Sequence, residues 1–182
     1  MPLPPRDVGG YRDRALLPRL GATLPPGRFL FDTNVFIHAL ARRRSPLPAL
    51  LFRAIGDAYV SGPIRAELAW LLGRLDPVHP NTASTIGLIE AMIGRVIVDK
   101  VLNPTRSQWL EAGMLAGQAA RTIAGGGKSI ATAAERQELI GDAMTAVLAA
   151  SAGCTIITED ADFDVLARFL PGLSVLFYDR AP

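Results

Sequence analysis

Acidic residues follow two apolar runs that have the character of buried strands. Asp32 comes directly after Phe29-Leu30-Phe31, and Asp160 and Asp162 follow the run at residues 154–158. In open α/β sheets, ligands bind beyond the carboxyl ends of the parallel strands, so acids at these positions face the expected binding edge. The alternative is that Asp160 or Asp162 only caps the helix that begins there.

Two further acids lie on predicted helices whose neighbouring positions are apolar. Glu67 is stacked near Ile64 and Leu71 at helical spacing, and glutamate is seldom buried unless it is paired. Asp142 flanks the apolar stripe of its helix, beside Gly141, which clears space at a cost of about 1 kcal/mol in helix propensity. The alternatives are an ion pair between Glu67 and a nearby arginine, and an exposed Asp142.

Together these acids predict a metal site. Carboxylates in one cleft repel one another and raise each other's pKa, and a bound divalent cation removes that cost. Oxygen ligands without a nearby His or Cys favour Mg²⁺ or Mn²⁺ over zinc. Such ions activate water and stabilise the charge of an in-line phosphoryl displacement. The candidate ligands are Asp32, Glu67, Asp142, Asp160 and Asp162.

Composition indicates one ordinary globular domain. The chain has 182 residues, of which 49% are hydrophobic and 20% charged. A single cysteine, Cys154, excludes an intrachain disulfide and suits a reducing compartment. The formal net charge is +2, which alone does not indicate nucleic-acid binding. Since no apolar stretch is long enough to span a bilayer and the first residues lack a signal-peptide core, we expect a cytoplasmic protein.

Short apolar runs alternate with helical patterns along most of the chain. We expect strands at 28–32, 58–60, 95–98, 154–158 and 174–178, and helices at 34–43, 46–56, 63–75, 81–93, 105–123, 132–152 and 162–169. This alternation predicts an α/β fold with a mainly parallel sheet. Residues 1–27, rich in proline and arginine, are expected to form an arm outside the core fold with a short helix over 10–20, and residues 28–182 the domain itself.

The acidic motifs resemble a known family. Asp32-Thr33-Asn34-Val35, then Glu67, Asp142 and Thr158-Glu159-Asp160-Ala161-Asp162-Phe163, occur in the order typical of PIN domains. Within that family the chain more closely resembles the VapC-type toxins of bacterial type II toxin–antitoxin pairs, over about residues 28–180. The 27-residue arm departs from the usual toxin pattern; binding RNA, covering the site and contacting another partner are all compatible with it.

The resemblance implies a PIN-like three-layer sandwich, with an approximately five-stranded sheet between helices, and a Mg²⁺- or Mn²⁺-dependent endoribonuclease. It further implies a cognate VapB-type antitoxin and a homodimer. The family's acidic quartet maps onto Asp32, Glu67, Asp142 and Asp160, an accessory metal-binding acid onto Asp162, and polar positions that orient the quartet onto Thr33, Asn34 and Thr158.

Other residues leave alternatives open. Arg42-Arg43-Arg44 closes the first predicted helix, either as a solvated helix end or as a phosphate contact for RNA. Trp70 and Trp109 are expected as core anchors, and the alternative is an exposed tryptophan that stacks on a base. A haloacid-dehalogenase-like phosphatase also begins with an aspartate after a strand, but it requires a second acid where this chain has Asn34. A non-enzymatic RNA- or partner-binding module is the remaining alternative.

Overall fold

A computed structural model describes residues 10–24, 26–40, 53–95, 98–125 and 132–178. Five parallel strands form within these segments. β1 (Arg28–Phe31), β4 (Cys154–Thr158) and β5 (Ser174–Phe177) form one sheet in the order β1-β4-β5. β2 (Val60–Ser61) pairs with β3 (Val101–Leu102), and a bridge between Leu30 and Tyr59 joins this pair to β1. The predicted α/β class with a parallel sheet is confirmed.

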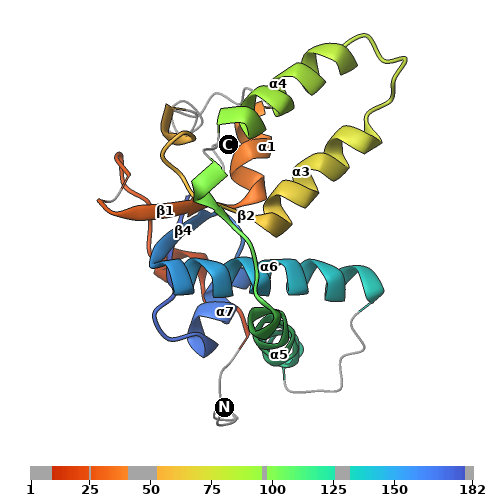
Figure 1. The fold of residues 1–182 in the computed structure, drawn as a ribbon. Coiled ribbons are helices and arrows are strands. Elements are labelled where there is room, and N and C mark those ends of the chain that lie inside the picture. The colour runs from red at the N-terminus through yellow and green to blue at the C-terminus, as the bar shows by residue number, and fades with distance from the viewer. Residues whose placement is uncertain (1–9, 25, 41–52, 96–97, 126–131, 179–182) are drawn as a thin grey trace.

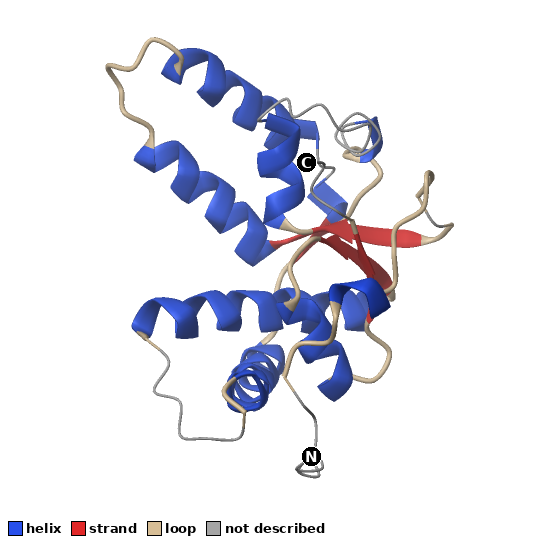
Figure 2. Ribbon diagram, turned by 180° about the vertical axis from the view of Figure 1, so that it is seen from behind, coloured by secondary structure: helices blue, strands red, loops and turns tan. Residues whose placement is uncertain are grey.

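Helices cover both faces of the sheet, which gives three layers (Figures 1 and 2). On one side lie α1 (Thr33–Leu40), α3 (Gly62–Arg74) and α4 (Thr82–Arg95), and the last two form a hairpin that extends away from the sheet. On the other side lie α5 (Arg106–Ile123), α6 (Ala133–Ala152) and α7 (Asp162–Phe169). Short 3-10 turns occur at Arg14–Leu16 and Val98–Lys100. None of the helices in these segments combines the length and apolarity needed to cross a membrane.

Local sequence signals set the ends of the helices that matter for the site. Ser61 caps α3 by accepting a hydrogen bond from the Ile64 amide, and proline occupies the first turn. Thr132 and Glu135 form a capping box at the start of α6. Gly153 ends α6 with a φ of 63°, a left-handed conformation that glycine adopts at little cost. The chain then turns directly into β4.

The core lies between the sheet and both helical layers. Leu30 and Phe31 of β1 and Ile156 and Ile157 of β4 are fully buried, and Cys154 is a buried free thiol. α6 contributes a long apolar face, with residues 143–149 all buried. Because β1 and β4 are covered on both faces, their sequences are continuous apolar runs rather than alternating ones.

The structure corrects three expectations. No strand forms over the described part of 95–98: Arg95 ends α4, Val98 begins a 3-10 turn, and the strand is Val101–Leu102. The arm does not lie outside the core, because Leu17 belongs to the buried cluster and the predicted helix shrinks to Arg14–Leu16. Finally, the expectation that Trp70 and Trp109 anchor the core is wrong, since they are 57% and 54% exposed.

Candidate metal centre

Asp32 lies just beyond β1, at the carboxyl edge of the parallel sheet. Its carboxylate is buried and both oxygens are held: the Thr33 amide donates to Oδ1 over 2.7 Å, and Thr158 Oγ1 donates to Oδ2 over 2.7 Å. Its own amide donates to the Ile157 carbonyl, which extends the pairing of β1 with β4 by one residue. The strand pairing therefore fixes the position of this acid.

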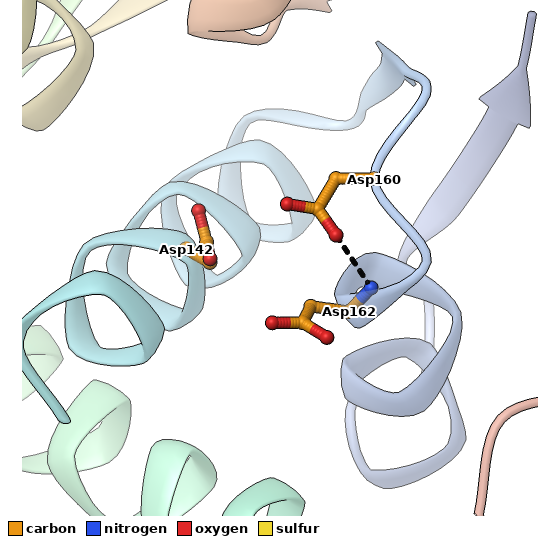
Figure 3. Close-up of side chains that lie close together, drawn as sticks. All are labelled: Asp142, Asp160 and Asp162. Atoms are coloured by element: carbon orange, nitrogen blue, oxygen red, sulfur yellow. Dashed lines mark hydrogen bonds between the residues drawn. The ribbon is translucent and has the colours of Figure 1, made fainter. Parts of the chain in front are cut away.

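Asp142, Asp160 and Asp162 converge beside this edge. Each offers one carboxylate oxygen such that these atoms all lie within 4.8 Å of one another, which is close enough to share a cation. Figure 3 shows Asp142 on α6 facing the two acids at the start of α7. The Asp162 amide donates to Asp160 Oδ1 over 2.9 Å, so Asp160 stabilises the start of α7 with one oxygen and leaves the other for the cluster.

Glu67 reaches the same region from α3. The residue is exposed as a whole, beside the buried positions Ile64 and Leu68. Its Oε2 nevertheless accepts a hydrogen bond from Thr33 Oγ1. A Cβ built on Gly141 would lie 3.4 Å from Glu67 Oε1, so the glycine leaves room for this carboxylate next to Asp142.

Hydroxyl and amide groups link the acids to each other. Thr158 Oγ1 donates to Asp32, accepts from the Asp160 amide over 2.9 Å, and lies 3.4 Å from the Asn34 amide nitrogen. Tyr178, whose role the sequence did not reveal, donates from its hydroxyl to Asn34 Oδ1 over 3.0 Å. The polar side chains after β1 and at the end of β4 thus form one continuous network behind the carboxylates.

The electrostatics show that the acids act as one group. The pKa of Asp32 is raised from its usual 3.8 to about 7, chiefly by burial; the charges of Asp160 and Glu67 contribute to the rise, and the hydrogen bonds from Thr158 and Thr33 oppose it. Burial also raises the pKa of Asp142 well above its usual value, and the charges of the other four acids add to this effect. The pKa of Asp160 is raised as well, again mainly by burial. A divalent cation bound among these acids would offset both the cost of burying their charges and their mutual repulsion.

The chemistry of these residues fits a divalent metal ion. Asp142 Oδ2 is buried and accepts no hydrogen bond within the described structure, so this oxygen lacks the partner that a buried acceptor requires. The clustered ligand atoms are all carboxylate oxygens, which is the donor set of Mg²⁺ and Mn²⁺. His38 is not part of this acidic cluster. Its Nε2 lies 3.4 Å from Oε1 of the buried Glu159.

A residue of the arm also reaches the acids. The Tyr11 hydroxyl donates to Asp162 Oδ1, and the Arg14 charge lowers the pKa of Asp160 against the effect of burial. No periodic pattern marks Tyr11, so sequence reasoning missed it; its only signal was an aromatic side chain among arginines. The predicted RNA contacts Arg42, Arg43 and Arg44 lie outside the described residues.

A parallel α/β sheet with carboxylates gathered at its carboxyl edge has the place and the donor set of a divalent-metal site. The family model "PIN domain" matches residues 29–169, and the chain belongs to the PIN-domain family. PIN domains are generally nucleases and usually bind divalent metal ions. A comparison with curated proteins gives no match.

Solved structures share the fold at low sequence identity. VapBC2 from Rickettsia felis, bound to a promoter DNA fragment, has a TM-score of 0.57 at 13% identity and covers 84% of this chain and 100% of its own. DNA-bound VapBC from Salmonella typhimurium has a TM-score of 0.56 at 18% identity, with 82% and 97% covered. FitAcB from Neisseria gonorrhoeae has a TM-score of 0.53 at 20% identity, with 81% and 96% covered.

Proposed function

We propose that the protein is a Mg²⁺- or Mn²⁺-dependent endoribonuclease. The observation that carries the proposal is the half-buried cluster of Asp142, Asp160 and Asp162 beside the buried Asp32, with one buried Asp142 oxygen left without a hydrogen-bond partner in the described structure. Buried like charges without cations around them are costly, and a structure retains them where they bind a charged group. The PIN fold adds a scaffold whose members are generally nucleases.

Each acid has a distinct part in this proposal. Asp142, Asp160 and Asp162 hold the cation, and Asp32 and Glu67 complete its surroundings from β1 and α3. The cation, when bound, supplies an activated water and neutralises charge on the phosphate. Hydrolysis then leaves a 5′-phosphate and a 3′-hydroxyl.

The hydroxyl groups orient the carboxylates before substrate arrives. Thr158 holds Asp32 through Oδ2, and Thr33 holds Glu67 through Oε2. Asn34 is fixed between Thr158 and Tyr178, so it steadies the network from behind. Preorganised ligands of this kind reduce the reorganisation that metal and substrate binding require.

The biological role we propose is that of a VapC-type toxin, held inactive by a VapB-type antitoxin and assembled as a homodimer. The structures that share the fold are of VapBC and FitAcB, which supports this role. Arg42, Arg43 and Arg44 remain proposed phosphate contacts for RNA, since guanidinium groups bind phosphate in a bidentate manner.

Cleavage of RNA by purified variants tests the proposal. Asp142→Asn and Asp32→Asn should each abolish Mn²⁺-dependent cleavage of single-stranded RNA and relieve growth arrest in a host that expresses the protein. Asp99→Asn is the matched control, because Asp99 is an exposed acid outside the cluster. Circular dichroism of each variant establishes that it is folded. Full activity in either cluster variant would refute the mechanism, and a wild-type protein that binds no Mn²⁺ would favour an RNA- or partner-binding module instead.

A further inference from the structure

The segment Gly10–Leu20, here called the strap, is fixed to the domain at its second half. Leu17 is buried in the core. The Leu20 amide donates to the Phe177 carbonyl and the Phe177 amide to the Pro18 carbonyl, each over 2.8 Å, so Arg19 lies beside Phe177 as a parallel neighbour of β5. The second half of the strap is therefore hydrogen-bonded to the edge of the sheet.

The first half of the strap is anchored on α7 by an ion pair between the half-exposed Arg12 and the buried Asp164. Arg12 Nε lies 2.9 and 3.0 Å from the two oxygens of Asp164, whose side chain is almost fully buried. Arg168 donates from Nη2 to the same carboxylate over 2.6 Å and from Nη1 to the Gly10 carbonyl over 2.9 Å. Both arginines thus tie the strap to the helix whose first residue is Asp162.

The first half of the strap also contacts the acidic segment itself. The Tyr11 hydroxyl donates to Asp162 Oδ1, and Arg14 Nη2 donates to the Glu159 carbonyl over 3.3 Å. The Tyr11 side chain is 52% exposed, so core packing does not dictate this contact. Figure 3 shows the two oxygens of Asp162 pointing in different directions, one of them toward Asp142. Tyr11 bonds only Oδ1, so the carboxylate keeps a second oxygen that can bind a cation.

We propose that Tyr11 is a positioning residue for Asp162, and that the strap acts through it to hold the metal-binding segment in the shape the cation needs. This inference rests on the proposed nuclease function and adds a part of the site that lies outside the matched family region at residues 29–169. Carboxylates that bind metals are commonly held by an outer hydrogen bond, and loss of such a partner weakens metal binding by roughly 10- to 100-fold.

Metal affinity measured by calorimetry tests this role with Tyr11→Phe in the full chain. We expect Mn²⁺ to bind the variant about tenfold more weakly than the wild type, with an unchanged thermal midpoint in the absence of metal. Tyr59→Phe is the matched control: it removes a phenol hydroxyl from the edge of β2, where the Tyr59 ring lies under Arg28, and should leave the affinity unchanged.

A second measurement needs no metal. The Asp162 amide is held by Asp160 Oδ1, so its hydrogen exchange in metal-free protein reports on the geometry of this turn. We expect several-fold faster exchange at Asp162 in Tyr11→Phe and no change in Tyr59→Phe.

The outcomes separate the two proposals. A wild-type protein that binds Mn²⁺ while Tyr11→Phe binds it equally well overturns the role of Tyr11 and leaves the nuclease proposal standing. Tighter binding by Tyr11→Phe also overturns it, because Tyr11 would then compete with the cation for Asp162. A wild-type protein that binds no Mn²⁺ overturns the nuclease proposal and this inference together.

Discussion

Thr158 Oγ1 donates a hydrogen bond of 2.7 Å to Asp32 Oδ2 across the junction of two parallel strands. The register of β1 and β4 pairs Phe31 with Ile157. The residues that follow this pair are Asp32 after β1 and Thr158 at the end of β4, so the acid and the hydroxyl that holds it lie side by side. The same hydroxyl accepts from the Asp160 amide. One side chain therefore sets the relation between the acid that follows β1 and the acids that follow β4.

Loss of that hydroxyl should disturb the site more than the fold. Thr158→Val removes a hydrogen bond to a buried carboxylate, which costs about 1.5–3 kcal/mol, and it leaves the Asp160 amide without its acceptor. We expect cleavage of RNA to fall by about 10- to 100-fold. Thr158→Ser keeps the hydroxyl and should retain most of the activity; equal activity of the valine and serine variants would contradict the positioning role.

The stability of the metal-free protein should decrease as the pH rises. Asp32 has its pKa raised by burial from 3.8 to about 7, and the Asp142 pKa is shifted in the same direction. Between about pH 4 and 7 the folded state keeps a proton that the unfolded chain has released, so the free energy of unfolding falls across this window.

Thermal unfolding in chelator measures this dependence. We expect the midpoint to drop by about 5 °C between pH 5 and pH 7.5, with a smaller drop in Asp32→Asn, which cannot ionise at this position. Asp99→Asn, at an exposed site, should behave like the wild type. A midpoint that rises over this interval would show that the acids are not held in mutual repulsion.

Metal binding should offset the loss of stability that the repelling carboxylates cause. Mn²⁺ at about 100 times its Kd is expected to stabilise the wild type by about 2.7 kcal/mol at pH 7.5. Asp142→Asn should raise the midpoint of the metal-free protein, because it removes a buried charge with an unpartnered oxygen. The same variant should lose the stabilisation by Mn²⁺, so one substitution raises the stability of the metal-free protein and lowers that of the metal-bound protein. An Asp142→Asn variant that Mn²⁺ stabilises as much as the wild type would exclude Asp142 as a ligand.

Sequence patterns predicted the three strands of the β1-β4-β5 sheet and most of the described helices, because amphipathic and apolar runs carry their own signal. The expected strand at 154–158 coincides with β4, and the expected helix at 162–169 coincides with α7. The expected strand at 95–98 was wrong at both of its described ends, because α4 continues to Arg95 and a 3-10 turn begins at Val98. The pairing of Val101 with Val60 is a long-range property that no local pattern encodes.

The arm shows the same limit more clearly. The proline and arginine content of the arm indicated an extended chain. Arg12 in fact pairs with Asp164, which is 152 residues away in sequence, and only the tertiary fold brings the two side chains together. The acids of the cluster were easier to find, because carboxylates among apolar neighbours are unusual in themselves. Their grouping still depended on the crossover topology, which places Asp142 of α6 beside the start of α7.

The depth to which the strap enters the core leads to a stability prediction at two adjacent leucines. Leu17 is 5% exposed and belongs to the main core cluster, whereas Leu16 is 71% exposed. Truncation of a buried leucine removes apolar contact and leaves a cavity, so Leu17→Ala should cost about 2–5 kcal/mol in urea unfolding. Leu16→Ala should stay within about 0.5 kcal/mol of the wild type. If the two variants were equally stable, the strap would be a detachable arm, and the hydrogen bonds of its neighbours with Phe177 would not be maintained in solution.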